Sequence, residues 1–395
     1  MQRYQALHAV LELVLDFSTL IGNLRQPVVL DSAAFSPAHA GPVQDVLASI
    51  FRTLELAAPE FRPLAGGAAT LCAAALDQHF AALLTPAWSG AVAACCADPS
   101  YLAGIPEYVR QYCHDVYYAG ITIERIAMAD GARLTCYRST RRAAPDVVVV
   151  LPCAMPYPMA RAWLSHLGGR YNVLAWETRG ASEASQRGAA TMALGLAEQA
   201  DDLLYMARHY CGSRPHVMGI CGGAVVAMEA ARRQPDAFAG LSLWHGDYNF
   251  GADALQTPYQ ENLRWMLDTA LAGRDSAEGV HGLFNDPGML KNLNPRHLPS
   301  VLCPYATVDS LHRYALLNGS VMAADVAGIA RQLPMAVSVI SSTGDQTAHP
   351  DGSRRLAEVL PDCKLYMEPG GDHLSLFDAH ARYREIAALC IGSGF

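Results

Sequence analysis

The sequence has no long apolar run, no basic cluster and no paired-cysteine motif. Of its 395 residues only 17% are charged, and the net charge is −8. This balance argues against nucleic acid and against an anionic membrane surface as partners. No stretch stays apolar for the roughly 20 residues that a membrane span needs. His8, Glu12 and Asp16 interrupt the apolar N-terminal segment and no small-residue cleavage site follows, so we interpret it as an amphipathic helix rather than a signal peptide.

The cysteines also lack a metal-binding or disulfide pattern. Eleven are present, an odd number, and no C-x-x-C or zinc-type Cys/His spacing occurs. Scattered single cysteines of this kind are typical of reduced thiols in a cytoplasmic protein. The sequence therefore predicts a cytoplasmic protein with no bound metal and no cofactor.

The hydrophobic periodicity changes near residue 118. Residues 1–118 show mostly helical spacing and carry no recognisable catalytic motif. Residues 119–395 begin with two strands joined by an Asp-Gly turn, and then strands alternate with helices, which is the pattern of an α/β fold with a mostly parallel, doubly wound sheet. Residues 250–332 interrupt this alternation. We expect them to form a helical cap insertion over the sheet, apolar enough to cover an acyl chain or simply packed on the core.

One turn in this alternation carries the pattern of a nucleophile. Gly219-Ile220-Cys221-Gly222-Gly223 lies between a predicted strand and a predicted helix. A sharp strand-to-helix turn strains the nucleophile and requires glycine beside it, at Gly219 and Gly223. The turn would place the Cys221 thiol at a helix N-terminus, which favours a thiolate. The backbone N–H of Gly222 would then serve as one oxyanion donor.

In this context, residues 119–395 resemble the α/β-hydrolase superfamily. Its nucleophile–acid–histidine order matches Cys221, then Asp345 in STGDQTAHP, then His373 in PGGDHLSLF. The last loop is similar to that of thioesterases from polyketide and peptide synthesis. The resemblance implies a Cys221–His373–Asp345 triad. It also implies a second oxyanion donor from the loop that contains Cys153 and Ala154.

A further loop also resembles this family. WETRGASEAS is similar to the D-x-R-G-x-G-x-S loop after a central strand, with Glu177, Arg179 and Gly180 in place. The strand-to-helix turn around Cys221, which we call the elbow, has the form Gly-x-Cys-x-Gly. It resembles the Gly-x-Cys-x-Gly-Gly elbow of polyhydroxyalkanoate synthases, and some acyltransferases also use cysteine.

Other residues compete for these roles. Asp247 follows the preceding strand and is the alternative acid, whereas Asp372 fits a turn residue better. His245 and His349 are expected to be ordinary surface or loop histidines. The tripeptide Asp309-Ser310-Leu311 resembles a phosphopantetheine attachment site, but a helix N-cap explains it better.

The cysteine favours acyl transfer over ester hydrolysis. An acyl-cysteine is itself a thioester, so loading it from a coenzyme A or carrier-protein thioester is nearly isoenergetic, and it can wait for an acceptor. The expected partner is therefore an acyl-CoA or acyl-carrier-protein substrate, and a homodimer stays open. The alternatives are a thioesterase or lactone hydrolase, and an inactive hydrolase-fold scaffold.

Overall fold

The computed structural model describes residues 2–63, 69–141, 144–182, 192–251 and 254–392. The chain divides into two compact units, Met1–Gly120 with Gly279–Val308, and Ile121–Glu278 with Asp309–Phe395. The middle of the expected cap insertion, residues 279–308, thus groups with the N-terminal residues. A pair of hydrogen bonds from the Leu71 N–H to the backbone and side-chain oxygens of Asn285, at 2.9 and 3.1 Å, contributes to this grouping.

The N-terminal unit is mostly helical. Its main helices are α1 (His8–Asp16), α2 (Ser18–Leu24), α3 (Pro37–Thr53), α4 (Leu71–Leu83), α5 (Pro86–Cys96) and α6 (Pro99–Tyr112). Two three-residue strands, β1 (Val29–Asp31) and β2 (Glu60–Arg62), pair in parallel. No single helix among the described residues meets the length and apolarity of a membrane span, although the bent pairs Arg3–Asp16 with Ser18–Leu24 and Leu71–Leu83 with Pro86–Cys96 do so together.

The second unit contains an eight-stranded sheet in the order β10-β9-β8-β7-β5-β6-β4-β3. The strands are β3 (Thr122–Ala127), β4 (Arg133–Ser139), β5 (Asp146–Val150), β6 (Asn172–Trp176), β7 (His216–Ile220), β8 (Gly240–Trp244), β9 (Val337–Ser342) and β10 (Cys363–Glu368). Strands β5 to β10 run parallel, and β3 and β4 form the predicted hairpin, with Gly131 at φ 85° in its turn. The doubly wound α/β prediction is confirmed.

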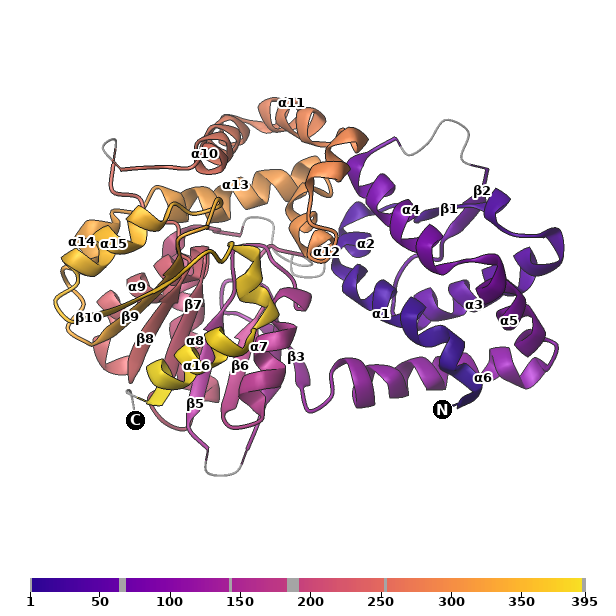
Figure 1. Cartoon of the computed structure of the whole chain (residues 1–395), viewed down its shortest axis with the longest axis horizontal. Helices are drawn as coiled ribbons and strands as arrows, with labels where there is room; N and C mark the ends of the chain where they lie inside the picture. Colours follow the sequence, from indigo (N-terminus) through magenta and orange to yellow (C-terminus); the bar gives the residue numbers. More distant parts are fainter. Residues whose placement is uncertain (1, 64–68, 142–143, 183–191, 252–253, 393–395) are drawn as a thin grey trace. The chain divides into compact units, whose positions relative to one another are not determined.

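Helices cover both faces of this sheet (Figure 1). They are α7 (Pro158–Gly168), α8 (Leu196–Tyr210), α9 (Gly222–Arg233), α14 (Val326–Ala330), α15 (Pro350–Val359) and α16 (Ala381–Gly392). On one face, Trp163 of α7 and Tyr383 of α16 both contact Trp244 of β8, with ring centroids 5.4 and 6.0 Å away. On the other face, α9 packs on β7 and β8 and against α8 and α14. All residues of β5, β7, β8 and β9 are buried, as a sheet covered on both sides requires.

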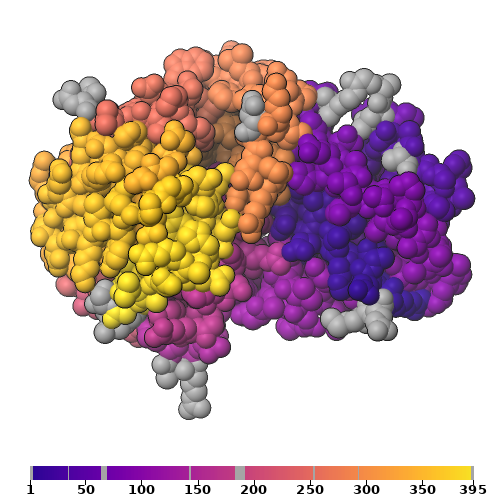
Figure 2. Space-filling view, in the orientation of Figure 1, coloured from indigo at the N-terminus to yellow at the C-terminus, as the bar shows by residue number. Residues whose placement is uncertain are grey.

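The C-terminal helix closes one side of this unit. In the space-filling view, the C-terminal residues form a continuous yellow surface on the face shown (Figure 2). Near the carboxyl ends of the parallel strands lie helices of the insertion that belong to this same unit.

Two helices of the expected cap belong to this unit, α10 (Pro258–Leu271) and most of α13 (Val308–Met322). Thr257 and Gln260 form a capping box that starts α10. Helix α13 begins at Val308, so Asp309 and Ser310 lie in its first turn and the N-cap interpretation of this pair is wrong. Met266 of α10 is buried whereas Trp265 is 55% exposed, so the apolar residues of the cap do not all pack on the core.

Candidate active site

The residues of the candidate site follow four adjacent parallel strands. Cys221 follows β7, His245 follows β8, and Asp345 and His373 lie in the loops after β9 and β10. These strands are neighbours in the order β10-β9-β8-β7. Their carboxyl ends therefore meet at one edge of the sheet, the usual place for a site in an open α/β fold.

Cys221 occupies the strained turn between β7 and α9. Its backbone has φ 52° and ψ −123°, a conformation that side-chain-bearing residues rarely adopt. A Cβ on Gly219 would lie 2.7 Å from the Ala224 Cα, and one on Gly223 would lie 2.8 Å from the Leu151 carbonyl oxygen. Both positions therefore require glycine, as the elbow pattern predicts. The half-buried Cys221 is held at the N-terminal end of α9.

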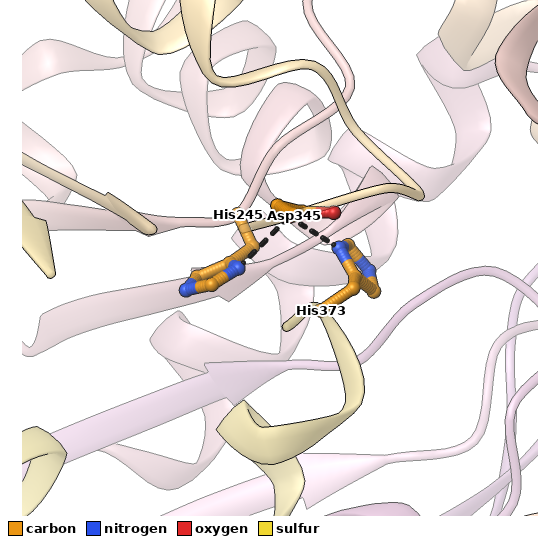
Figure 3. Close-up of side chains that lie close together, drawn as sticks. All are labelled: His245, Asp345 and His373. Atoms are coloured by element: carbon orange, nitrogen blue, oxygen red, sulfur yellow. Dashed lines mark hydrogen bonds and ion pairs between the residues drawn. The ribbon is translucent and has the colours of Figure 1, made fainter. Parts of the chain in front are cut away.

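Asp345 is a buried carboxylate with four hydrogen-bond donors. Its Oδ1 accepts from the backbone N–H groups of Thr347 and Ala348, each at 2.8 Å. Its Oδ2 lies 2.9 Å from Nδ1 of His373 and 2.9 Å from Nδ1 of His245 (Figure 3). Burial opposes ionisation, but the charge of His373 and the hydrogen bonds from both imidazoles outweigh it, so the pKa of Asp345 is lowered. The carboxylate stays ionised at neutral pH.

His373 lies between Asp345 and Cys221. The imidazole is 5% exposed. Burial by itself lowers its pKa, but the charges of Asp345 and Cys221 and its hydrogen bonds to both raise the pKa well above the ordinary value. The structure thus brings together the three residues predicted from the sequence, in an arrangement that favours the imidazolium form of His373.

His245 corrects the expectation of an ordinary surface or loop histidine. It is fully buried, with φ 47°, and its Nδ1 bonds to the same oxygen of Asp345 that His373 uses. The hydroxyl of Tyr383 lies 3.1 Å from its other ring nitrogen, Nε2. Local sequence does not reveal this contact. The signal that could have found it is the parallel pairing of β8 with β9, which places the residues that follow these strands at one edge of the sheet.

Among the described residues, one group of side chains has potential metal-ligand atoms that lie close together. It consists of His245, Asp345 and His373. The separations of 2.9 Å between each Nδ1 and Oδ2 are those of hydrogen bonds. Two ligand atoms that each lie about 2.0–2.2 Å from one tetrahedral zinc ion would be roughly 3.4 Å apart. Both imidazoles are also directed at one oxygen atom. We therefore assign these contacts as hydrogen bonds.

The loop after β5 lies beside the elbow. A Cβ on Gly222 would lie 3.2 Å from Sγ of Cys153 and 3.2 Å from Oδ1 of Asn318 on α13. The Cys153 thiol donates to Oε1 of Gln199 at 3.3 Å. Ala154 has φ 61°, so this loop is also locally strained. The oxyanion roles of the Gly222 N–H and of the N–H groups of Cys153 and Ala154 stay predictions.

The competing acid makes different contacts. Asp247 accepts a hydrogen bond from Gln260 of the cap helix α10. Burial raises the pKa of Asp247, although Gln260 and the charge of Arg264 oppose this rise. Asp345, not Asp247, is the carboxylate that bonds to His373.

The remaining competing residues lie in turns. Asp372 accepts from the backbone N–H of Ser375 at 2.7 Å, as a turn residue does. His349 caps α15, where its Nδ1 accepts from the backbone N–H of Asp351 at 3.2 Å.

The loop after β6 is held in place by buried ion pairs and hydrogen bonds. Arg179 bonds through Nε and Nη2 to both carboxylate oxygens of Asp202, at 2.8 and 2.6 Å, and through Nη1 to Asp130. Glu177 accepts from the Tyr137 hydroxyl at 2.9 Å and from the Tyr157 N–H at 3.2 Å. Residues 183–185, the end of the motif resemblance, lie outside the described residues.

Comparison with known proteins identifies the fold. No protein-family model matches the chain, and no curated protein matches it by sequence. Solved structures do match. A membrane phospholipase A described as a bacterial virulence factor aligns with TM-score 0.56 and 14% identity, over 77% of this chain and 97% of that chain. A putative lipase from Acinetobacter baumannii AYE aligns with TM-score 0.53 and 12% identity, over 73% and 97%.

An enol-lactonase from Burkholderia xenovorans LB400 also matches, with TM-score 0.51 and 17% identity, over 69% of this chain and 99% of the lactonase. Identities this low establish the fold and nothing finer. The chain has the α/β-hydrolase fold, as the order of its motifs predicts.

Proposed function

We propose that this protein is an acyl-transferring enzyme that takes its acyl group from a thioester and carries it on Cys221. The observation that supports this most strongly is the arrangement of the strained Cys221 turn and the buried His373–Asp345 pair at one edge of the sheet. A nucleophile, a base and a group that orients the base are the parts that covalent acyl transfer needs.

In the proposed reaction, the Cys221 thiolate attacks the thioester carbonyl. The new carbon–sulfur bond gives a tetrahedral oxyanion, which the Gly222 N–H and the Cys153–Ala154 loop would stabilise. When the oxyanion collapses, the donor thiolate leaves and takes the proton from Nε2 of His373. His373 then removes a proton from the acceptor, which attacks the acyl-cysteine and releases Cys221. Asp345 holds the imidazole in the correct tautomer throughout.

Hydrolysis is the second candidate. The solved structures of similar fold include a phospholipase, a lipase and a lactonase, whose names describe hydrolysis. A thioesterase or lactone hydrolase would use the same residues, with water as the acceptor. The two candidates differ only in how the acyl-cysteine is discharged.

Intact-mass spectrometry of the protein mixed with acyl-CoA donors of different chain lengths separates these candidates. Transfer predicts an acyl adduct that persists in water and is discharged when one alcohol, amine or carrier-bound acceptor is added. An adduct that water clears at the full steady-state rate, whatever acceptor is present, would leave a hydrolase. Cys221→Ala is the control and should form no adduct. The complete absence of an adduct in the wild type would contradict both candidates.

A further inference from the structure

The carboxylate of Asp345 serves two imidazoles, although a catalytic triad needs only one. His245 and His373 each place Nδ1 2.9 Å from Oδ2, while Oδ1 is occupied by two backbone N–H groups. The side chains of Asp345 and His245 are both fully buried. A second buried histidine on the catalytic acid therefore requires an explanation within the proposed function, on which this inference rests.

The hydrogen-bond partners determine where the protons lie. An ionised carboxylate can only accept, so both imidazoles must donate their Nδ1–H to Asp345. His373 then has Nε2 free for the Cys221 thiol. His245 instead presents Nε2 to the hydroxyl of Tyr383 at 3.1 Å. Burial raises the pKa of Tyr383, so this hydroxyl keeps its proton and can donate a hydrogen bond to the unprotonated Nε2 of His245.

The surrounding charges keep His245 neutral. Burial lowers its pKa, and the positive charge of His373 lowers it further, against the opposing effect of Asp345 and Asp372. The other titratable groups that act on this cluster are Cys221 from the β7 turn, Asp247 after β8 and Tyr383 from α16. Of the two imidazoles on Asp345, His373 is the one placed to carry a proton to and from the reaction.

We propose that His245 is a positioning residue whose second hydrogen bond to Asp345 both orients the carboxylate and limits the negative charge that it presents to His373. With His245 in place, Asp345 shares its oxygen between two donors and attracts the His373 proton less strongly. His373 can then pass that proton to the departing thiolate and accept one from the incoming acceptor. Without His245, Asp345 would hold the imidazolium more tightly.

The backbone supports this arrangement. The N–H of His245 donates to the carbonyl of Ile340 on β9 at 2.8 Å, so the residue after β8 is tied to the strand that leads to Asp345. The positive φ of 47° turns the side chain away from the regular strand direction. Asparagine tolerates this conformation better than most residues, and its amide nitrogen can occupy the place of Nδ1. His245→Asn is therefore the conservative variant.

The test measures alkylation of Cys221 by iodoacetate as a function of pH, with the label located by peptide mass spectrometry. The thiolate displaces iodide to form a thioether, and no acyl donor is needed. Because iodoacetate is an anion, the His373 imidazolium accelerates this reaction, and the rate falls as the imidazolium loses its proton. The pH at which the rate falls, the upper limb of the profile, thus reports the pKa of His373.

The variants are His245→Phe, which removes both hydrogen bonds, and His245→Asn, which keeps the one to Asp345. The matched control is His216→Phe, because His216 is equally buried and bonds to Ser242 at 2.9 Å on strands β7 and β8. In His245→Phe the upper limb should move about 0.5–1 pH unit higher, because Asp345 then acts on His373 alone. His245→Asn should return it toward the wild-type position, and His216→Phe should leave it unchanged.

Tyr383→Phe provides a second route to the same answer if His245→Phe does not fold. Without the hydroxyl, the Nδ1–H tautomer of His245 is no longer enforced, and the upper limb should shift upward by less. Normal labelling of Cys221 with no shift in any folded variant of His245 or Tyr383 would overturn this inference and leave the proposed function intact. Failure of iodoacetate to label wild-type Cys221 would instead contradict the proposed function, and this inference with it.

Discussion

The two histidines on the Asp345 carboxylate share one contact and differ in the other, and their pKa values are shifted in opposite directions. On each side a buried histidine donates Nδ1–H to the same oxygen at the same distance, 2.9 Å. On one side the far nitrogen meets Cys221, and the pKa of His373 is raised. On the other side it meets Tyr383, and the pKa of His245 is lowered. The group at Nε2 thus differs between the two sides: His373 faces Cys221, whose charge, together with that of Asp345, raises the pKa of His373, whereas burial is the main cause of the lowered pKa of His245.

Removing the thiol should have the largest effect. In Cys221→Ala, neither imidazole has a nucleophile at Nε2, and the difference between the two sides is lost. We expect turnover of any acyl donor to fall by about 10⁵–10⁶-fold, as removal of a triad nucleophile does in other enzymes. Steady-state kinetics with unchanged circular dichroism would check this. Retention of more than a small fraction of the activity would contradict the nucleophile assignment.

Removing the shared carboxylate should come next. Asp345→Asn removes the charged group that accepts the Nδ1–H of both imidazoles, and we expect turnover to fall by about 10³–10⁴-fold because the His373 tautomer is no longer enforced. Asp247→Asn is the matched control and should change turnover by much less, since Asp247 bonds to Gln260 rather than to His373. If the two variants showed the reverse order, the catalytic acid would be Asp247.

The opposite pKa shifts of the two histidines also predict opposite contributions to stability. The raised pKa of His373 stabilises the fold below about pH 6.5, and this contribution is lost as pH rises through the folded-state value. His245 has a lowered pKa, so the unfolded chain binds a proton below about pH 6.5 that the folded chain does not, and stability falls there. Each such proton changes the free energy of unfolding by at most about 1.4 kcal/mol per pH unit.

Urea unfolding at about pH 5 and about pH 7 would separate these contributions. His245→Asn should reduce the loss of stability on acidification, and His373→Asn should increase it. A change of the same sign in both variants would show that the two imidazoles are not in different protonation states.

The smallest effect is expected at the Tyr383 side. Tyr383→Phe removes the hydroxyl's contact with Nε2 of His245 and its hydrogen bonds with Ser342 and Ser375, but none of these involves His373. The phenyl ring can still pack against Trp244. Turnover near neutral pH should therefore fall only a few-fold, by about one hydrogen bond's worth of free energy. A loss as large as that in Asp345→Asn would mean that Tyr383 acts on the reaction directly.

The elbow and the alternating fold could be predicted because their determinants are local. Gly219, Cys221 and Gly223 lie within five residues, and their chemistry depends on a turn that the flanking strand and helix already indicate. Asp345 and His373 could be selected because each follows a strand in the order known for this fold. The α/β-hydrolase fold followed from the same order.

His245 could not be predicted in this way. Its bond to Asp345 joins residues 100 positions apart, and its bond to Tyr383 spans 138. Both depend on the packing of β8, β9 and α16 and on the left-handed backbone at His245, none of which the segment LWHGDYNF encodes locally. Residues 279–308 escaped prediction for a similar reason, because their grouping with the N-terminal unit includes contacts such as that of Leu71 with Asn285.

The most direct test of the central claim, that Cys221 is the activated nucleophile, is competitive labelling of all eleven cysteines. The protein would be treated with limiting iodoacetamide near neutral pH and mapped by peptide mass spectrometry. Burial raises the pKa of Cys72, Cys136 and Cys211 to about 12, so these thiols should react slowly. The account predicts that Cys221 is labelled first and that His373→Asn removes this preference. Labelling of another cysteine ahead of an inert Cys221 would contradict it.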